Sequence, residues 1–190
     1  HPDHLNGLNF IAANFSPKEF WYNGQDIETP EFVQLMKTLR RNGVNVLHPV
    51  ELSGGKETAG GKIEFFHPIA NDKPSFSSIS RDDSGTNNNS LVLKFSYQGR
   101  AFLFPGDIEK QAEVSIVAAA GERLKSDILL VPHHGSKTSS TEGFLNAVRP
   151  EISVISCGKG NSFKFPNNQV IQRLTDIGSE IIRIDESGAV

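Results

Sequence analysis

The sequence predicts a layered α/β domain, in which helices cover a sheet of β-strands. Two observations indicate this class. In the second half of the chain, apolar runs of strand length alternate with segments that have helical periodicity. Before them, the alternating run Ser90–Tyr97 and the apolar run Ala101–Phe104 flank a Gly-containing turn, which is typical of a β-hairpin. With 190 residues the chain is long enough for one domain with a real core. We therefore expect a single domain over residues 1–190.

The first half of the chain carries shorter helix and strand signals. Asp3 suits a helix N-cap, because Leu5, Leu8 and Ile11 follow it at helical spacing. Thr29 precedes a proline and an apolar stripe, which predicts the start of a second helix. Strands are expected at residues 19–22, 44–47 and 63–66, a Gly-rich loop at 53–61 and a long polar loop at 71–89.

The second half reads as strand and helix in turn. Helices are expected at residues 108–120, 141–148 and 167–177, and strands at 128–131, 151–156 and 179–184. A turn is expected after the last strand, at residues 185–188. These segments predict a sheet whose later strands are joined by helices.

Composition excludes several classes of protein. The net charge is −3, so no global basic field attracts nucleic acid, and a polyanion must be held by a local patch or by metal ions. The single cysteine, Cys157, excludes an internal disulfide and a thiolate-rich zinc site. No apolar run approaches the ~20 residues of a membrane-spanning helix. We expect a soluble, cytoplasmic chain, and its oligomeric state stays open.

The candidate site is centred on residues 127–140. An apolar strand is ended there by Pro132, which has no N–H to donate, and His133 and His134 follow. Imidazoles at the mouth of a buried strand lie where α/β folds keep their chemistry. Neighbouring residues of an extended chain point in opposite directions, so one of the two is expected to face a metal. The sequence does not decide which.

Two other stretches supply complementary ligands. His1, Asp3 and His4 lie within one turn at the start of the first helix. Asp107 follows an apolar strand and Gly106, a position that suits a metal-bridging carboxylate as well as a helix N-cap. Imidazoles and carboxylates without thiolates suit one or two divalent ions, zinc first and manganese as an alternative.

Such a set of ligands predicts hydrolysis. Two ions about 3.5–4 Å apart that share a carboxylate would hold a hydroxide nucleophile and clamp the leaving oxygen. Asp3 and Asp107 are therefore the catalytic candidates. The chemistry alone does not choose among phosphodiesters, esters, lactones and amides. Ser136, Lys137 and Ser139 are candidates for holding a substrate phosphate, although a helix N-cap cluster explains the serines equally well.

Taken together, these stretches resemble the metallo-β-lactamase superfamily. The run His1-x-Asp3-His4 resembles the second half of its H-x-H-x-D-H motif, Gly106-Asp107 its strand-Gly-Asp motif, and the double histidine its later strand-end histidine. More narrowly, the chain is similar to the hydrolase domain at the C-terminus of ComEC-type DNA-uptake proteins and to related stand-alone hydrolases. The closer match is carried by residues 89–92, 106–109, 131–139, 148–150 and 185–188.

The resemblance implies an αββα sandwich, two sheets with helices outside, and a metal-dependent hydrolase. Cleavage of DNA phosphodiesters, as by a nuclease, is the activity proposed for the competence members. Carried over by position, Asp3 and His4 bind one ion, His1 binds the other, Asp107 bridges them, and one residue of the 133–134 pair completes the set. Asn89, within a shared motif, joins the substrate-binding candidates.

Three departures from the family pattern keep alternatives open. The first motif histidine and at least one strand would precede residue 1, so we expect truncation there. We also expect truncation at Val190, where the chain should enter a further strand. Asn88-Asn89 stands where many members have a metal-binding histidine. Phe165 stands where the competence-like branch often has histidine. The alternatives are hydrolysis of a small ester, lactone or headgroup phosphodiester, and a degenerate binding or regulatory module.

Overall fold

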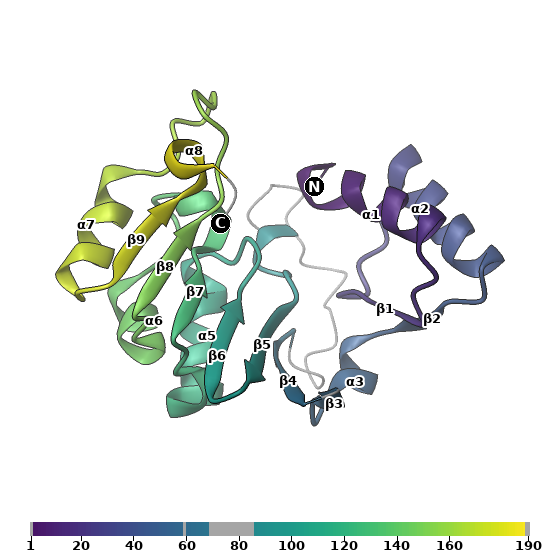
Figure 1. Ribbon diagram of the computed structural model, residues 1–190, viewed down its shortest axis with the longest axis horizontal. Coiled ribbons are helices and arrows are strands. Elements are labelled where there is room, and N and C mark those ends of the chain that lie inside the picture. The colour runs from purple at the N-terminus through teal and green to yellow at the C-terminus, as the bar shows by residue number, and fades with distance from the viewer. Residues whose placement is uncertain (1, 59, 69–85, 189–190) are drawn as a thin grey trace. The chain divides into compact units, whose positions relative to one another are not determined.

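The structure is a computed structural model, and it describes residues 2–58, 60–68 and 86–188 (Figure 1). The chain divides into two compact units, His1–Ser53 and Gly54–Val190, and each is described by itself. The predicted α/β class is confirmed, because helices alternate along the chain with strands, and seven of these strands form one mixed sheet. The single domain over residues 1–190 stays a prediction. No helix among the described residues has the length and apolar character needed to cross a membrane.

The first unit is a small α/β assembly. Its elements are α1 (Pro2–Asn14), β1 (Glu19–Trp21), α2 (Pro30–Arg41), β2 (Asn45–Leu47) and α3 (Pro49–Leu52). The two strands pair in parallel. Helix α2 begins as predicted, with proline in its first turn and the Thr29 side chain accepting a hydrogen bond from the N–H of Phe32. Its apolar face packs Leu35 and Leu39 against Ala12 of α1.

The second unit contains the seven-stranded sheet. Its strands, in spatial as well as chain order, are β3 (Lys56–Thr58), β4 (Gly61–His67), β5 (Val92–Tyr97), β6 (Arg100–Phe104), β7 (Ile128–Leu130), β8 (Ile152–Ile155) and β9 (Glu180–Arg183). The pairs from β3 to β6 are antiparallel, and those from β6 to β9 are parallel.

Helices connect the parallel strands of this sheet. They are α5 (Lys110–Ala120) with the 3₁₀ turn η1 (Gly121–Leu124), α6 (Glu142–Val148) and α7 (Asn168–Asp176); the 3₁₀ turn η2 (Pro132–Gly135) and α8 (Ile184–Ser187) follow β7 and β9. One apolar core joins the sheet to these helices through fully buried side chains such as Leu103, Leu129, Ile116, Leu145 and Leu174. Burial of this apolar surface is the main force that holds the helices against the sheet.

Several predicted boundaries differ from the structure. Strand β3 lies inside the segment predicted as a Gly-rich loop, where it pairs with β4. Helix α5 begins at Lys110 rather than Ile108, because Glu109 is extended and serves as its N-cap. After β9 the chain forms the short helix α8 where a turn was predicted. The helices predicted over 141–148 and 167–177 are confirmed as α6 and α7, and the side chains of Thr141 and Asn167 cap them.

Candidate metal centre

Four parallel strands end at the same edge of the sheet, and each is followed by a segment with ionisable side chains (Figure 1). Asp107 follows β6, the histidine pair follows β7, the loop of residues 158–166 follows β8, and Asp185 follows β9. In open α/β sheets, ligands bind outside the carboxyl ends of the strands. The topology therefore brings these segments to one edge, as expected for Asp107 and the histidines.

Asp107 is held in place by its neighbours. Asp107 is only 6% exposed, and its backbone N–H donates to the Ser90 hydroxyl at 3.0 Å. Gly106 has a φ of +63°, and a Cβ at this position would lie 2.8 Å from the Cβ of Ser90. Only glycine suits this turn, because it tolerates positive φ and has no side chain to collide. Asp107 is thus fixed beside the start of β5.

The two histidines occupy a strained turn. His133 has φ and ψ of 50° and 41°, and His134 has 55° and 20°, so both are left-handed. This conformation costs an L-residue roughly 1–2 kcal/mol. The backbone N–H of His133 donates to the carbonyl of Gly106 at 3.1 Å, which ties the turn to the Asp107 segment. The prediction that the two histidines lie on an extended chain was therefore wrong. The two rings nevertheless face different groups, as predicted.

The ring of His134 is oriented by the neighbouring strand. Its Nδ1 lies 2.7 Å from the carbonyl oxygen of Ser156, which follows β8. Because a carbonyl only accepts hydrogen bonds, Nδ1 must carry the proton, and Nε2 of the neutral ring keeps its lone pair. That Nε2 lies 3.8 Å from Oδ1 of Asp107. A histidine whose second nitrogen donates to a carbonyl is the usual arrangement of a metal ligand.

The ring of His133 faces other partners. Its Nδ1 lies 3.3 Å from Oε1 of Glu109, the residue that precedes α5. Its ring packs edge-on against Phe165, with centroids 5.8 Å apart and planes at 68°. His133 is consequently placed between a carboxylate and an aromatic ring.

Asp107 and His134 fit two positions of a metal site. Two donors that share one ion at bonds near 2.1 Å lie roughly 3–3.5 Å apart, which is about 0.3–0.8 Å less than the 3.8 Å between these two atoms. An imidazole with a carboxylate suits zinc or manganese. Within the described part of the chain, no group of three or more His, Cys, Asp or Glu side chains is arranged to hold an ion.

The other predicted ligands belong to the first unit. His1 lies outside the described residues. Asp3 and His4 are in the first turn of α1, and their side chains also lie outside the description. Their role as ligands stays a prediction.

Two of the serines predicted to hold substrate brace the turn after the histidines. The buried hydroxyl of Ser139 lies 3.0 Å from the carbonyls of both Pro132 and Ser136. The Ser136 hydroxyl is 2.9 Å from that of Thr138. Lys137 is exposed and Asn89 is half-buried. The substrate-binding roles of Ser136, Lys137, Ser139 and Asn89 stay predictions.

A buried carboxylate that sequence reasoning missed clamps this same segment. Glu113 of α5 is fully buried and accepts hydrogen bonds from the N–H of Ser140 at 2.5 Å and from the N–H and hydroxyl of Thr141 at 2.9 and 2.6 Å. Burial raises the pKa of Glu113, against the opposing effect of these bonds and of Arg173. Arg173 of α7 donates to the carbonyls of Ser139 and Ser140. The sequence did carry a signal for this clamp, because a glutamate on the apolar face of a predicted helix must find partners inside the protein.

Asn88 has a structural role at the start of a helix. The side-chain oxygen of Asn88 accepts hydrogen bonds from the N–H groups of Glu109 and Ala112, at 2.9 and 3.3 Å, and so caps α5. Nε2 of His67 lies 2.8 Å from the Asn88 carbonyl. His67, the last residue of β4, thus contacts the segment that caps α5.

An ion pair lies beyond β9 at the same edge. Arg183 donates to both carboxylate oxygens of Asp185, at 3.1 and 2.7 Å, and this contact lowers the pKa of Asp185. Cys157 is buried nearby, and burial together with a hydrogen bond to Asp185 raises the pKa of its thiol to about 11. Without a bound ion, the thiol is therefore protonated at neutral pH.

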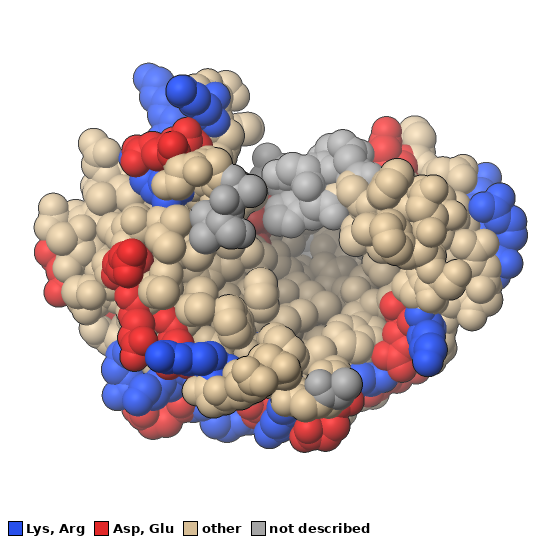
Figure 2. Space-filling view, in the orientation of Figure 1, with Lys and Arg blue, Asp and Glu red and all other residues tan. Residues whose placement is uncertain are grey.

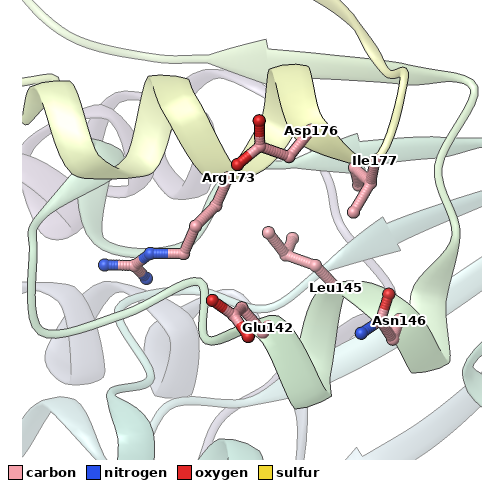
Figure 3. Close-up of a pocket in the computed structure, with 6 residues that line it drawn as sticks. All are labelled: Glu142, Leu145, Asn146, Arg173, Asp176 and Ile177. Atoms are coloured by element: carbon pink, nitrogen blue, oxygen red, sulfur yellow. The ribbon is translucent and has the colours of Figure 1, made fainter.

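A pocket of about 180 Å³ lies between α6 and α7 (Figure 3). Its lining residues are Glu142, Leu145, Asn146, Arg173, Asp176 and Ile177. The guanidinium of Arg173 reaches away from it toward the segment that leads into α6 (Figure 3). None of the predicted site residues lines this pocket, so it is separate from the candidate metal centre.

Comparison with known proteins confirms the similarity to competence proteins that the motifs predicted. The chain is 27% identical to ComE operon protein 3 of Bacillus subtilis over 188 residues, which is 99% of this chain and 23% of that protein. It is 42% identical to Competence protein ComA of Neisseria gonorrhoeae over 109 residues, which is 57% of this chain and 15% of that protein. The chain thus spans less than a quarter of the length of either relative. No protein-family model matches it.

Among solved structures, the chain is similar to a protein from Parabacteroides distasonis that is provisionally named a metal-dependent hydrolase. The TM-score is 0.47 at 14% identity, and the match covers 92% of this chain and 79% of that one. Similarity at this level does not by itself identify a function.

Proposed function

We propose that the chain is a metal-dependent hydrolase that cleaves phosphodiesters, with nucleic acid as the substrate class. The observation that carries this proposal is the pair formed by Asp107 and His134 at the carboxyl edge of the sheet. The strained backbone of the histidine turn supports it, since such strain is concentrated at functional sites. One relative is named a competence protein, which favours nucleic acid among phosphodiesters.

We infer that His134, rather than His133, is the metal ligand of the pair. The Ser156 carbonyl fixes the proton on Nδ1 of His134 and leaves Nε2 toward Asp107. Asp107 and His134 would hold a zinc or manganese ion, which would supply Lewis acidity toward a phosphoryl oxygen of the substrate. Lys137, exposed just beyond the turn, offers a positive charge to the phosphate.

A matched pair of variants tests this assignment. His134→Asn removes the proposed ligand, whereas His133→Asn removes the neighbouring imidazole, which faces Glu109. Asparagine tolerates left-handed backbone better than most residues, so both variants keep the turn. The protein is stripped with chelator, reloaded with zinc or manganese, and assayed for bound metal and for cleavage of a fluorescent single-stranded oligonucleotide and bis(p-nitrophenyl) phosphate.

We expect His134→Asn to lose metal and at least about 100-fold in cleavage rate, because losing even an outer partner of a ligand costs roughly 10- to 100-fold. His133→Asn should keep its metal and stay within about tenfold of the wild-type rate. Cleavage that is indifferent to chelator, or equal metal loss in both variants, would contradict the proposal. Asp3→Asn in the same metal assay tests the ligand predicted on α1. A nitrophenyl ester in the panel tests the ester alternative.

A further inference from the structure

The loop between β8 and α7 presents an exposed aromatic side chain. Phe163 is 74% exposed, the highest value among the large hydrophobic residues that the structure describes. The loop projects beyond the strand ends of the second unit (Figure 1). A partner that covered this ring would gain the free energy of burying its apolar surface.

Phe163 is the outer member of a row of rings. It stacks on Phe165 with centroids 5.5 Å apart and planes only 16° from parallel. Phe165 in turn packs edge-on against His133, beside the candidate metal centre. One face of Phe163 is covered by Phe165, and the other is open to a further flat ring.

The loop holds these rings rigidly. The side chain of Asn161 donates to the carbonyls of Gly158 and Phe165, and accepts from the N–H of Phe165 at 2.9 Å. At the end of the loop, the N–H of Asn167 donates to the carbonyl of Gly135 at 2.9 Å, which anchors the loop to the histidine turn. A ring ordered in advance loses little entropy when a ligand stacks on it.

The charge of this loop differs from that of the whole chain. Residues 158–166 include Lys159 and Lys164 and no acid, while the chain carries a net charge of −3. Both lysines are exposed, and Figure 2 shows positive side chains at the projecting end of the loop. A local positive patch attracts phosphates even when the whole protein is acidic.

We propose that this loop is a stacking subsite for a base of single-stranded nucleic acid. A base stacks on the open face of Phe163, and Lys159 and Lys164 meet the phosphates beside it. Proteins that hold single strands combine a positive surface with aromatic rings in this way. The placement of the scissile phosphate at Asp107 and His134 rests on the function proposed above. A membrane is a poorer match, because one flat ring pair offers little apolar area for insertion.

The test measures binding by metal-free protein, so that no cleavage intervenes. Fluorescence anisotropy compares a thymidine 12-mer with a 12-mer in which every base is absent, and a uridine 12-mer separates RNA from DNA. The variant is Phe163→Ala, and the matched control is Phe10→Ala, whose ring is 62% exposed in the first unit. Lys164→Ala should weaken the binding of all three oligomers alike, since phosphates are common to them.

We expect wild-type protein to bind the thymidine 12-mer about tenfold more tightly than the abasic one, since stacking of one base on a ring is worth roughly 5- to 100-fold. Phe163→Ala should abolish this preference, Phe163→Trp should keep it, and Phe10→Ala should leave it intact. A preference that survives Phe163→Ala overturns the proposal, as does binding to vesicles of one-quarter anionic lipid that depends on Phe163 while oligomer binding does not. Base preference without metal-dependent cleavage would count against the hydrolase alone. Cleavage without base preference would count against the subsite alone.

Discussion

Replacement of Gly135 gives the sharpest test of how the candidate centre is built. This glycine follows His134 and has a φ of +81°, and a Cβ there would lie 2.7 Å from the Cβ and 3.2 Å from the Cα of Pro166. Real Cβ atoms essentially never approach that closely. Gly135→Ala must therefore either distort the histidine turn or displace Pro166, at the end of residues 158–166, which we call the stacking loop.

The expected cost has two parts. Alanine in left-handed backbone costs roughly 1–2 kcal/mol. Forcing a methyl group into a packed site adds about 1–3 kcal/mol. The sum is about 2–5 kcal/mol of unfolding free energy. Gly160→Ala is the matched control, because Gly160 has a φ of +67° in the stacking loop and no atom lies within 4 Å of its added Cβ. This variant should lose only the roughly 1–2 kcal/mol that left-handed backbone costs alanine.

Urea unfolding followed by far-UV circular dichroism measures both variants. We expect the midpoint of Gly135→Ala to fall well below that of Gly160→Ala at an unchanged m-value, and its melting temperature to drop by about 4–20 °C. Metal binding should weaken in Gly135→Ala only, because the residue adjoins His134. Equal destabilisation of the two variants would show that the contact with Pro166 does not constrain the turn.

Two further predictions concern buried groups. In Glu113→Gln an amide NH₂ must face the N–H of Ser140 or of Thr141, so we expect a loss of about 2–4 kcal/mol. Since burial raises the pKa of Glu113, wild-type stability should fall as pH rises above the ordinary value of 4.5, and the variant should lack this fall. Urea midpoints of both proteins at pH 5 and pH 8 test this. A difference in midpoint between wild-type protein and the variant that is the same at both pH values would contradict it. With its pKa at about 11, about one Cys157 thiol in a thousand is ionised at pH 8, so a disulfide reagent should react at least 100-fold more slowly with native than with unfolded protein. Equal rates would refute this.

Signals that lie close together in the sequence predicted the local structure. Thr29, Thr141 and Asn167 each mark a helix start, because the side chain itself accepts a hydrogen bond from a free N–H of the first turn. Apolar runs of strand length located β5 to β9. Strand β3 was missed because its stability comes from pairing with β4, which no pattern within Lys56–Thr58 reveals.

The candidate site was predictable where topology alone decides. Asp107 and the histidine pair each follow a parallel strand, and such strands end at one edge of the sheet. The orientation of each ring was not predictable. It depends on the left-handed turn and on the Ser156 carbonyl, which another strand supplies. The Glu113 clamp escaped for a similar reason, because its partners lie 27 and 28 residues along the chain.

The strain of the histidine turn is offset by bonds between the strand-end segments. Two left-handed histidines cost roughly 2–4 kcal/mol together. Three contacts oppose this cost: the N–H of His133 to Gly106, Nδ1 of His134 to Ser156, and the N–H of Asn167 to Gly135. At about 0.5–1.5 kcal/mol each, they return a similar amount. Each contact joins the turn to a different segment, so the turn, the Asp107 segment and the stacking loop should lose their order together when any one of them is disturbed.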